Sequence, residues 1–190
     1  MPSSKIPASS QPRRPSANSA VAQIDGRHVG LAPVFDARAR LLVLGSFPGA
    51  ASLQAAQYYA HPRNAFWPAM GALVGEDLLA LPYAERLHAL RRHRVAMWDA
   101  VAACKREGSL DTAIGCVEPS DLRELVSRLP RLRAVACNGA LAHKQTLLAL
   151  YDVGTPVLRL PSTSPANAGV SLTAKIETWR TTLAPYLTSG

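Results

Sequence analysis

Residues 58–68, YYAHPRNAFWP, bring aromatic rings close to an imidazole, a guanidinium and an amide. An aromatic ring beside such groups suits a site in which a planar ligand is stacked next to a reactive centre. The same residues also fit a structural role, because asparagine is a favoured helix N-cap and Asn64 precedes the helical pattern AFWPAMGALV. The aromatic side chains would then belong to the core. The stretch alone leaves both interpretations open.

Two other short segments have the composition of ligand-binding loops. GSFPG (45–49) places two glycines around a proline, a rigid turn whose backbone N–H groups can approach a ligand closely. PSTSPAN (161–167) supplies three hydroxyls and an amide, which suit contacts to phosphate. Neither contains the GK[ST] or GxGxxG pattern of the common nucleotide-binding loops. Each segment alone could equally be an ordinary turn.

Four apolar runs predict buried strands at residues 40–45, 94–101, 133–139 and 156–165. Patterns typical of helices lie between them. Strands that alternate with helices indicate a parallel sheet covered on both faces. We therefore expect an α/β protein, a three-layer α/β/α sandwich with a central four-stranded parallel sheet.

The polar clusters of the sequence follow these strands. GSFPG follows the first strand, Asp99 ends the second, Asn138 and Gly139 end the third, and PSTSPAN follows the fourth. Ligands of such sheets bind outside the carboxyl ends of the strands. The sequence therefore predicts that four separate loops converge on one site at this edge.

The composition fits one domain with a basic surface. The 190 residues have a formal net charge of +8, which suits a polyanionic partner such as nucleic acid. The N-terminal segment is rich in Ser, Pro, Ala and basic residues, so we expect a disordered basic tail over residues 1–27 and one domain over 28–190. A transit peptide is the alternative for the tail. No apolar run approaches the roughly 20 residues of a membrane helix.

The cysteines indicate a reduced protein. Cys104, Cys116 and Cys137 form no CxxC pair and are odd in number, which predicts neither a disulfide framework nor a zinc site. We expect no metal and no cofactor, and a reducing, cytoplasmic environment.

Taken together, the three loops resemble a known family. LGSFPG (44–49), YYAHPRNAFW (58–67) and LPSTSPAN (160–167) are similar to motifs of the uracil-DNA glycosylase superfamily, and most of all to its hypoxanthine-DNA glycosylase branch. HPRNAFW is close to the HPANRFW of the mismatch-specific uracil glycosylases, and GSFPG stands where those enzymes have GINPG. WDAV…REGSLD (98–111) also resembles the hypoxanthine branch, although no role follows for its loop. The resemblance spans about residues 30–185 and implies the same α/β/α sandwich.

The resemblance implies a DNA glycosylase whose catalytic residue lies in an unusual motif. The mismatch-specific enzymes have a catalytic Asn in GINPG, and the matching position here is Phe47, which can neither orient water nor bear charge. In the hypoxanthine branch the important Asn is that of HPRN, which here is Asn64. The implied reaction flips out a deaminated base, expected to be hypoxanthine, and hydrolyses its N-glycosidic bond to leave an abasic site. These motifs contain no lysine, so we expect no Schiff base and no strand cleavage.

The resemblance and the chemistry of hypoxanthine suggest roles for the loop residues. Tyr59 aligns with the stacking aromatic of the mismatch enzymes, and Phe47 is expected to line the opposite wall. Asp99 can only accept hydrogen bonds when ionised and is expected to take the N1–H of the base, with a structural aspartate as the alternative. The expected substrate-binding residues are Gly45, Ser46, Phe47, Pro48, Gly49, Tyr59, His61 and Asp99. The expected DNA-binding residues are Arg63, Ser162, Thr163, Ser164 and Asn167.

Two alternatives share these features. One is a uracil or G·T/G·U mismatch glycosylase, against which the missing GINPG asparagine argues. The other is a catalytically weak DNA-binding module, which Phe47 would also allow. We expect a monomer that acts in the cytoplasm, associated with the nucleoid, on double- or single-stranded DNA containing a deaminated base, without membrane association.

Overall fold

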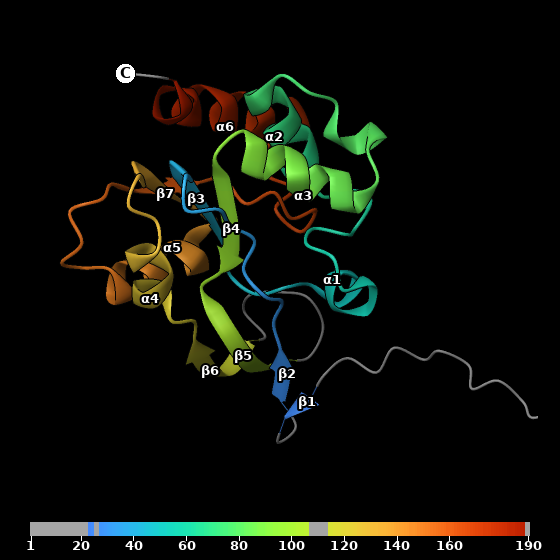
Figure 1. The fold of residues 1–190 in the computed structure, drawn as a ribbon. Coiled ribbons are helices and arrows are strands. Elements are labelled where there is room, and N and C mark those ends of the chain that lie inside the picture. The colour runs from blue at the N-terminus through green and yellow to red at the C-terminus, as the bar shows by residue number, and fades with distance from the viewer. Residues whose placement is uncertain (1–22, 25–26, 107–113, 189–190) are drawn as a thin grey trace, which may run out of the picture.

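A four-stranded parallel sheet lies at the centre of the computed structural model (Figure 1), which describes residues 23–24, 27–106 and 114–188. Its strands are β3 (Leu41–Gly45), β4 (Val95–Asp99), β7 (Ala134–Asn138) and β8 (Val157–Leu160), in the order β4-β3-β7-β8. Every residue of the central strands β3 and β7 is buried. Strands buried on both faces appear in the sequence as continuous apolar runs, which is why β3 and β7 could be predicted.

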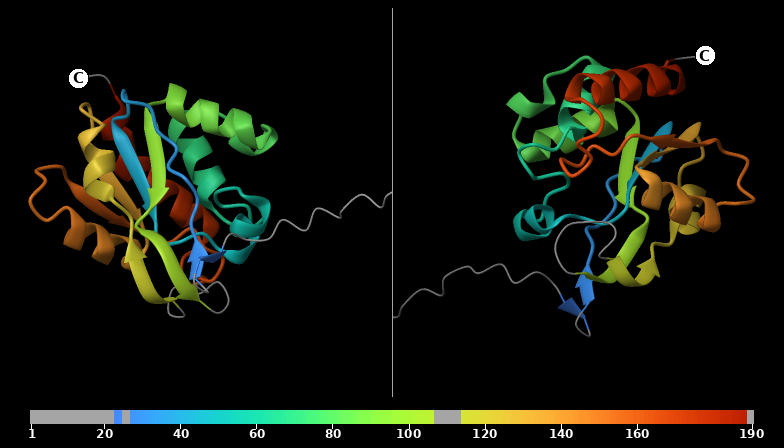
Figure 2. Two further views of the ribbon diagram at one scale, coloured as in Figure 1. Left: turned by 60° about the horizontal axis from the view of Figure 1, so that its bottom comes forward. Right: turned by 180° about the vertical axis from the view of Figure 1, so that it is seen from behind.

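Helices cover both faces of this sheet (Figure 2). Alternate residues of β3 face the two layers, because side chains alternate along a strand. Leu41 and Val43 pack in the cluster that includes residues of α2, α3 and α6, whereas Leu42 and Leu44 pack in the cluster that includes residues of α4 and α5. The helices are α1 (Ala50–Ala55), α2 (Phe66–Val74), η1 (Leu78–Ala80), α3 (Tyr83–Arg92), α4 (Leu122–Ser127), α5 (Ala140–Ala149) and α6 (Leu172–Leu187). The three-layer α/β/α sandwich is therefore confirmed. Over the described ranges, no helix combines the length and apolarity needed to cross a bilayer.

A second, antiparallel sheet was not predicted from the sequence. It consists of β1 (Gln23–Ile24), β2 (Arg27–Val29), β5 (Val101–Arg106) and β6 (Ile114–Pro119), in the order β1-β2-β5-β6. The chain leaves β4 at Asp99 and enters β5 at Val101, so the apolar run 94–101 belongs to two sheets. This second sheet extends beyond the carboxyl ends of β3 and β4 (Figure 1).

The new sheet also concerns the N-terminal segment. Gln23, Ile24 and Arg27 lie within the predicted tail 1–27, and the structure pairs them in β1 and β2. The other residues of that segment lie outside the described residues, as do residues 107–113, which include part of REGSLD. The domain boundary at residue 28 stays a prediction.

Candidate active site

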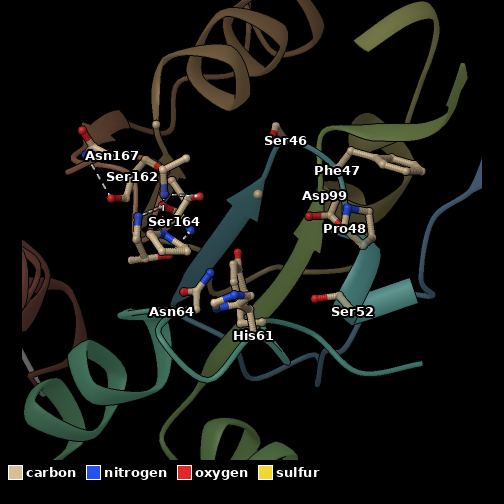
Figure 3. A pocket seen from close by; sticks show the side chains of 18 of the residues that line it. Ser46, Phe47, Pro48, Ser52, His61, Asn64, Asp99, Ser162, Ser164 and Asn167 are labelled. Carbon is tan, nitrogen blue, oxygen red and sulfur yellow. Dashed lines mark hydrogen bonds between the residues drawn. The ribbon is translucent and has the colours of Figure 1, made fainter. Parts of the chain in front are cut away.

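A cleft of about 890 Å³ opens at the carboxyl ends of the parallel strands (Figure 3). Its walls come from the segments that follow β3, β4, β7 and β8 and from the loop that precedes α2. The four polar clusters thus meet at one edge of the sheet, and the volume is that of a pocket for a small organic ligand. All the residues that the sequence nominated for the site line this cleft, except the exposed Arg63.

Asn64 is held in place by backbone hydrogen bonds on both sides. Its N–H donates to the carbonyl of His61 over 2.9 Å, and its Oδ1 accepts from the N–H of Phe66 over 2.9 Å. The next residue, Ala65, donates its N–H to the carbonyl of Thr163 over 3.0 Å. The N-cap position of α2 is Ala65 rather than Asn64, but the Asn64 side chain still satisfies an N–H of the first turn. Asn64 can therefore both bond the first turn of α2 and line the cleft.

His61 lies beside Asn64 at the edge of the cleft (Figure 3). Its Nδ1 accepts a hydrogen bond from the backbone N–H of Arg63 over 3.1 Å. A nitrogen that accepts cannot also carry a proton, so the neutral ring has its proton on Nε2. His61 therefore offers a hydrogen-bond donor rather than a base to a ligand in the cleft.

Gly45 allows two polar side chains to approach the end of β3. A Cβ atom built on Gly45 would lie 2.3 Å from Oδ1 of Asp99 and 3.1 Å from the hydroxyl of Tyr59. Asp99 is only 3% exposed, although it lines the cleft. Burial, and secondarily the nearby Asp99 carboxylate, raises the pKa of Tyr58.

The two adjacent tyrosines have different environments. Tyr58 is buried in the core, and its hydroxyl lies 3.1 Å and 3.0 Å from the carbonyl oxygens of Leu31 and Ala32. Tyr59 is partly exposed, lines the cleft and has a φ of 54°, which is uncommon for a residue with a side chain. Its ring stacks on the buried Phe66 with 3.7 Å between ring centroids and 14° between ring planes. Phe66 therefore fixes the orientation of the Tyr59 ring.

Phe47 borders the cleft, but its ring packs elsewhere. The residue is 7% exposed and forms a buried cluster with Val101 and Cys104 on β5. In Figure 3 the ring points away from Asn64. Phe47 therefore lines the cleft while its ring attaches the GSFPG turn to the antiparallel sheet, and its role as an aromatic wall for the base stays a prediction.

Residues 161–167, which we call the serine loop, form the facing wall. Thr163 is 1% exposed, and its Oγ1 and N–H form two hydrogen bonds of 2.8 Å each with the side chain of Asn138. The hydroxyls of Ser162 and Ser164 accept backbone N–H groups within the loop, over 3.3 Å in each case. Asn167 donates its Nδ2 to the carbonyl of Ser162 over 3.1 Å. Of the three hydroxyls, that of Thr163 faces the fold and those of the two serines stay near the cleft.

Three residues near the site had no role assigned from the sequence. Asn138 was expected at this edge as the end of a strand, and the structure shows that its side chain bonds Thr163. Arg159 on β8 is exposed and lines the cleft, but within a strand pattern nothing marks it. Lys175 on α6 is buried and donates to carbonyls of the serine loop. The sequence feature that could have identified Lys175 is its position four residues before Trp179 and eight before Leu183. This spacing places a lysine on the apolar face of the helix.

The architecture is that of an α/β/α protein with a cleft at the carboxyl edge of a short parallel sheet. The chain belongs to the uracil DNA glycosylase superfamily, whose sequence model matches residues 32–183. Within the described residues, no group of three or more His, Cys, Asp or Glu side chains could hold a metal ion.

Two relatives are named hypoxanthine DNA glycosylase. The protein of Methanosarcina barkeri is 43% identical and that of Methanosarcina acetivorans is 38% identical, in both cases over 138 residues that make up 73% of this chain and 87% of the relative. The fold is similar to a solution structure from Methanosarcina acetivorans described as a candidate uracil DNA glycosylase. The TM-score is 0.76 at 33% identity, over 85% of this chain and 99% of the other.

Proposed function

We propose that the chain is a monofunctional DNA glycosylase that removes hypoxanthine from deaminated DNA and leaves an abasic site. The observation that carries the proposal is the fixed amide of Asn64 at the cleft, in a chain similar to two hypoxanthine DNA glycosylases. A base inside a duplex cannot reach such a cleft, so the damaged nucleotide must be flipped out of the stack.

The cleft offers partners for the polar edge and the face of hypoxanthine. The base presents an N1–H donor and an O6 acceptor. The carboxylate of Asp99 accepts N1–H, and backbone N–H groups at Ser46 and Phe47 donate to O6. Tyr59, held by Phe66, supplies the aromatic surface, and stacking of this kind contributes roughly 1–3 kcal/mol per base.

Asn64 positions the attacking water. Glycosidic hydrolysis passes through an oxocarbenium-like state, which a correctly placed water captures at the anomeric carbon. An amide is a poor base, but Asn64 has two N–H donors on Nδ2 and a second lone pair on Oδ1, whose first lone pair accepts from Phe66. Its contribution is therefore orientation of the water rather than removal of a proton. The Nε2–H of His61 can donate a hydrogen bond to the departing base, and the base takes up the proton that the water loses as the C–O bond forms and the C–N bond breaks.

The serine loop and nearby positive charge hold the DNA backbone. The hydroxyls of Ser162 and Ser164 and the guanidinium of Arg159 contact phosphates, and Arg63 contributes from outside the cleft. Helix α5 begins at Ala140, which lines the cleft, so the partial positive charge of the helix N-terminus also faces the DNA backbone. Thr163 positions this loop through Asn138. We expect the protein to act as a monomer on duplex or single-stranded DNA of the cytoplasmic nucleoid.

The test of the proposal is an excision assay with purified protein and duplexes that contain inosine, uracil, xanthine or a G·T mismatch. Abasic sites should form in the inosine duplex, and strands should break there only after alkali. A weaker reaction on uracil and the mismatch is expected, since Phe47 replaces the asparagine of GINPG. Strand breaks without alkali would contradict the monofunctional mechanism, and binding without abasic sites would favour a DNA-binding module.

Replacing Asp99 by asparagine tests the reading of the base. The variant Asp99→Asn keeps the shape of the side chain but removes the charge that accepts N1–H, so excision of hypoxanthine should fall by roughly tenfold or more. Single-turnover rates on the inosine duplex measure this. Asp152→Asn is the matched control, because Asp152 is exposed, pairs with Arg123 and precedes β8 at the opposite edge of the sheet. Equal rates for Asp99→Asn and the unmodified protein would refute the assigned role.

A further inference from the structure

Lys175 is a buried lysine whose ammonium group bonds to the serine loop. It is 5% exposed, and its Nζ donates to the carbonyl of Asn167 over 2.6 Å and to that of Ser164 over 3.3 Å. In the part of the chain that the structure describes, no carboxylate lies within ion-pair distance of this ammonium. Among the described residues, the partners of this positive charge are therefore backbone carbonyls.

Trp179 holds the other end of the same loop. It follows Lys175 by four residues on α6, so both side chains lie on one face of the helix. Its Nε1 donates to the carbonyl of Pro161 over 2.9 Å, and the residue is fully buried. One turn of α6 thus fixes both the beginning and the end of the serine loop, and the Asn167–Ser162 hydrogen bond closes the loop on itself.

Burying the ammonium group of Lys175 costs folding free energy, because the charge loses its hydration. If the position served only to fill space, an apolar side chain would suffice. Burial lowers the pKa of Lys175, which reflects the loss of hydration of the charged form. An apolar side chain of similar length would fill the same space without that loss. The carbonyl of Asn167, however, would then lose the 2.6 Å bond from Lys175, and the carbonyl of Ser164 would keep only the N–H of Asn167, at 3.1 Å. The end of the serine loop would lose its two bonds to α6.

We propose that Lys175 is the positioning residue of the serine loop: it holds Ser162 and Ser164 in the arrangement that receives a DNA phosphate. The inference rests on the proposed role of those serines as phosphate ligands. Lys175 itself is not among the residues that line the cleft, so it acts through the loop rather than on the substrate. The expected consequence is an effect on DNA affinity that exceeds the effect on the chemical step.

The first measurement separates affinity from chemistry. Lys175→Met should raise the enzyme concentration for half-maximal excision of an inosine duplex by about tenfold, with a much smaller loss in the maximal single-turnover rate. Lys175→Arg, which keeps the donors and the charge, should recover most of the affinity. Lys144→Met is the matched control, because Lys144 is an exposed lysine on α5 and should behave as the unmodified protein.

The second measurement asks whether Lys175 works through the serines. In the triple variant Lys175→Met, Ser162→Ala, Ser164→Ala, affinity should fall no further than in the double serine variant, because the lysine has nothing left to position. Additive losses, or a Lys175→Met variant that binds like the control, would overturn the inference. If Lys175→Met does not fold, as judged by thermal melting, the same cycle run with Lys175→Gln gives the answer.

The two proposals fail in different ways. If the serine substitutions leave affinity unchanged, the serines are not phosphate ligands, and the proposed mode of DNA binding is wrong. If the serine substitutions weaken binding and Lys175→Met does not, only the role of Lys175 is refuted.

Discussion

Excision of hypoxanthine should fall by roughly 100- to 1000-fold in the variant Asn64→Ala, the loss typical of removing one positioned polar group from an active site. The side-chain amide accepts from the N–H of Phe66, and the backbone N–H of Asn64 donates to the carbonyl of His61. A water bound to the amide is therefore oriented before the base departs. Affinity for DNA should change little, because the proposed phosphate contacts come from the serine loop. Single-turnover assays and fluorescence anisotropy with an inosine duplex measure the two quantities.

Substitution of Asn64 also removes the hydrogen bond from the N–H of Phe66 to Oδ1, and a control must separate the two effects. Loss of this bond should reduce the free energy of unfolding by about 1 kcal/mol, which lowers the melting temperature by roughly 2–4 °C. Asn64→Ser keeps an oxygen that can accept from the first turn of α2 but lacks the amide. It should melt close to the unmodified protein and still be inactive. Near-normal excision by either variant would exclude Asn64 as the catalytic residue.

The variant Gly45→Ala should be almost as damaging, although it adds only one methyl group. That methyl would lie 2.3 Å from Oδ1 of Asp99, a side chain too buried to swing into solvent. Asp99 or the end of β3 must shift, and the hydroxyl of Tyr59 at 3.1 Å would be pushed as well. A displacement near 1 Å can cost about 100-fold in rate, and we expect a loss of that order in excision of hypoxanthine.

Gly154→Ala is the matched control for this prediction. A Cβ at Gly154 meets nothing within 4 Å, and the residue lies in the turn before β8, at the edge of the sheet opposite the cleft. Its excision rate should equal that of the unmodified protein. If Gly45→Ala also retained full activity, the close approach of Asp99 and Tyr59 to β3 would not be needed for binding or excision of the base.

The parallel sheet and the location of the site could be predicted because burial and topology leave clear signals. β3 and β7 are apolar throughout, and the polar clusters that follow the parallel strands occur where the sheet topology requires a site. The antiparallel sheet gave no such signal. Its strand β5 has register shifts against β6, so a regular alternation of apolar and polar residues is absent.

The orientations of individual side chains in the site could not be predicted. Ser162, Thr163 and Ser164 are equivalent hydroxyls in the sequence, and only the position of Asn138 at the end of β7 turns the middle one inward. Phe47 lines the cleft, but its ring packs against the unpredicted strand β5, where burial is more favourable than exposure beside a solvent-filled space. Contacts with distant residues, which local patterns do not encode, decide both cases.

The burial of Phe47 limits the evolutionary routes between activities. An asparagine at position 47 would bring back the residue of the GINPG motif, but it would leave Val101 and Cys104 facing a void and a polar group. Loss of a buried phenylalanine costs on the order of 3 kcal/mol, a large part of the stability of an ordinary domain. The single substitution Phe47→Asn would therefore lower stability, whether or not it added activity on a second base. Compensating changes at Val101 or Cys104 would reduce this cost, so the packing behind the cleft constrains which side chain can stand at position 47.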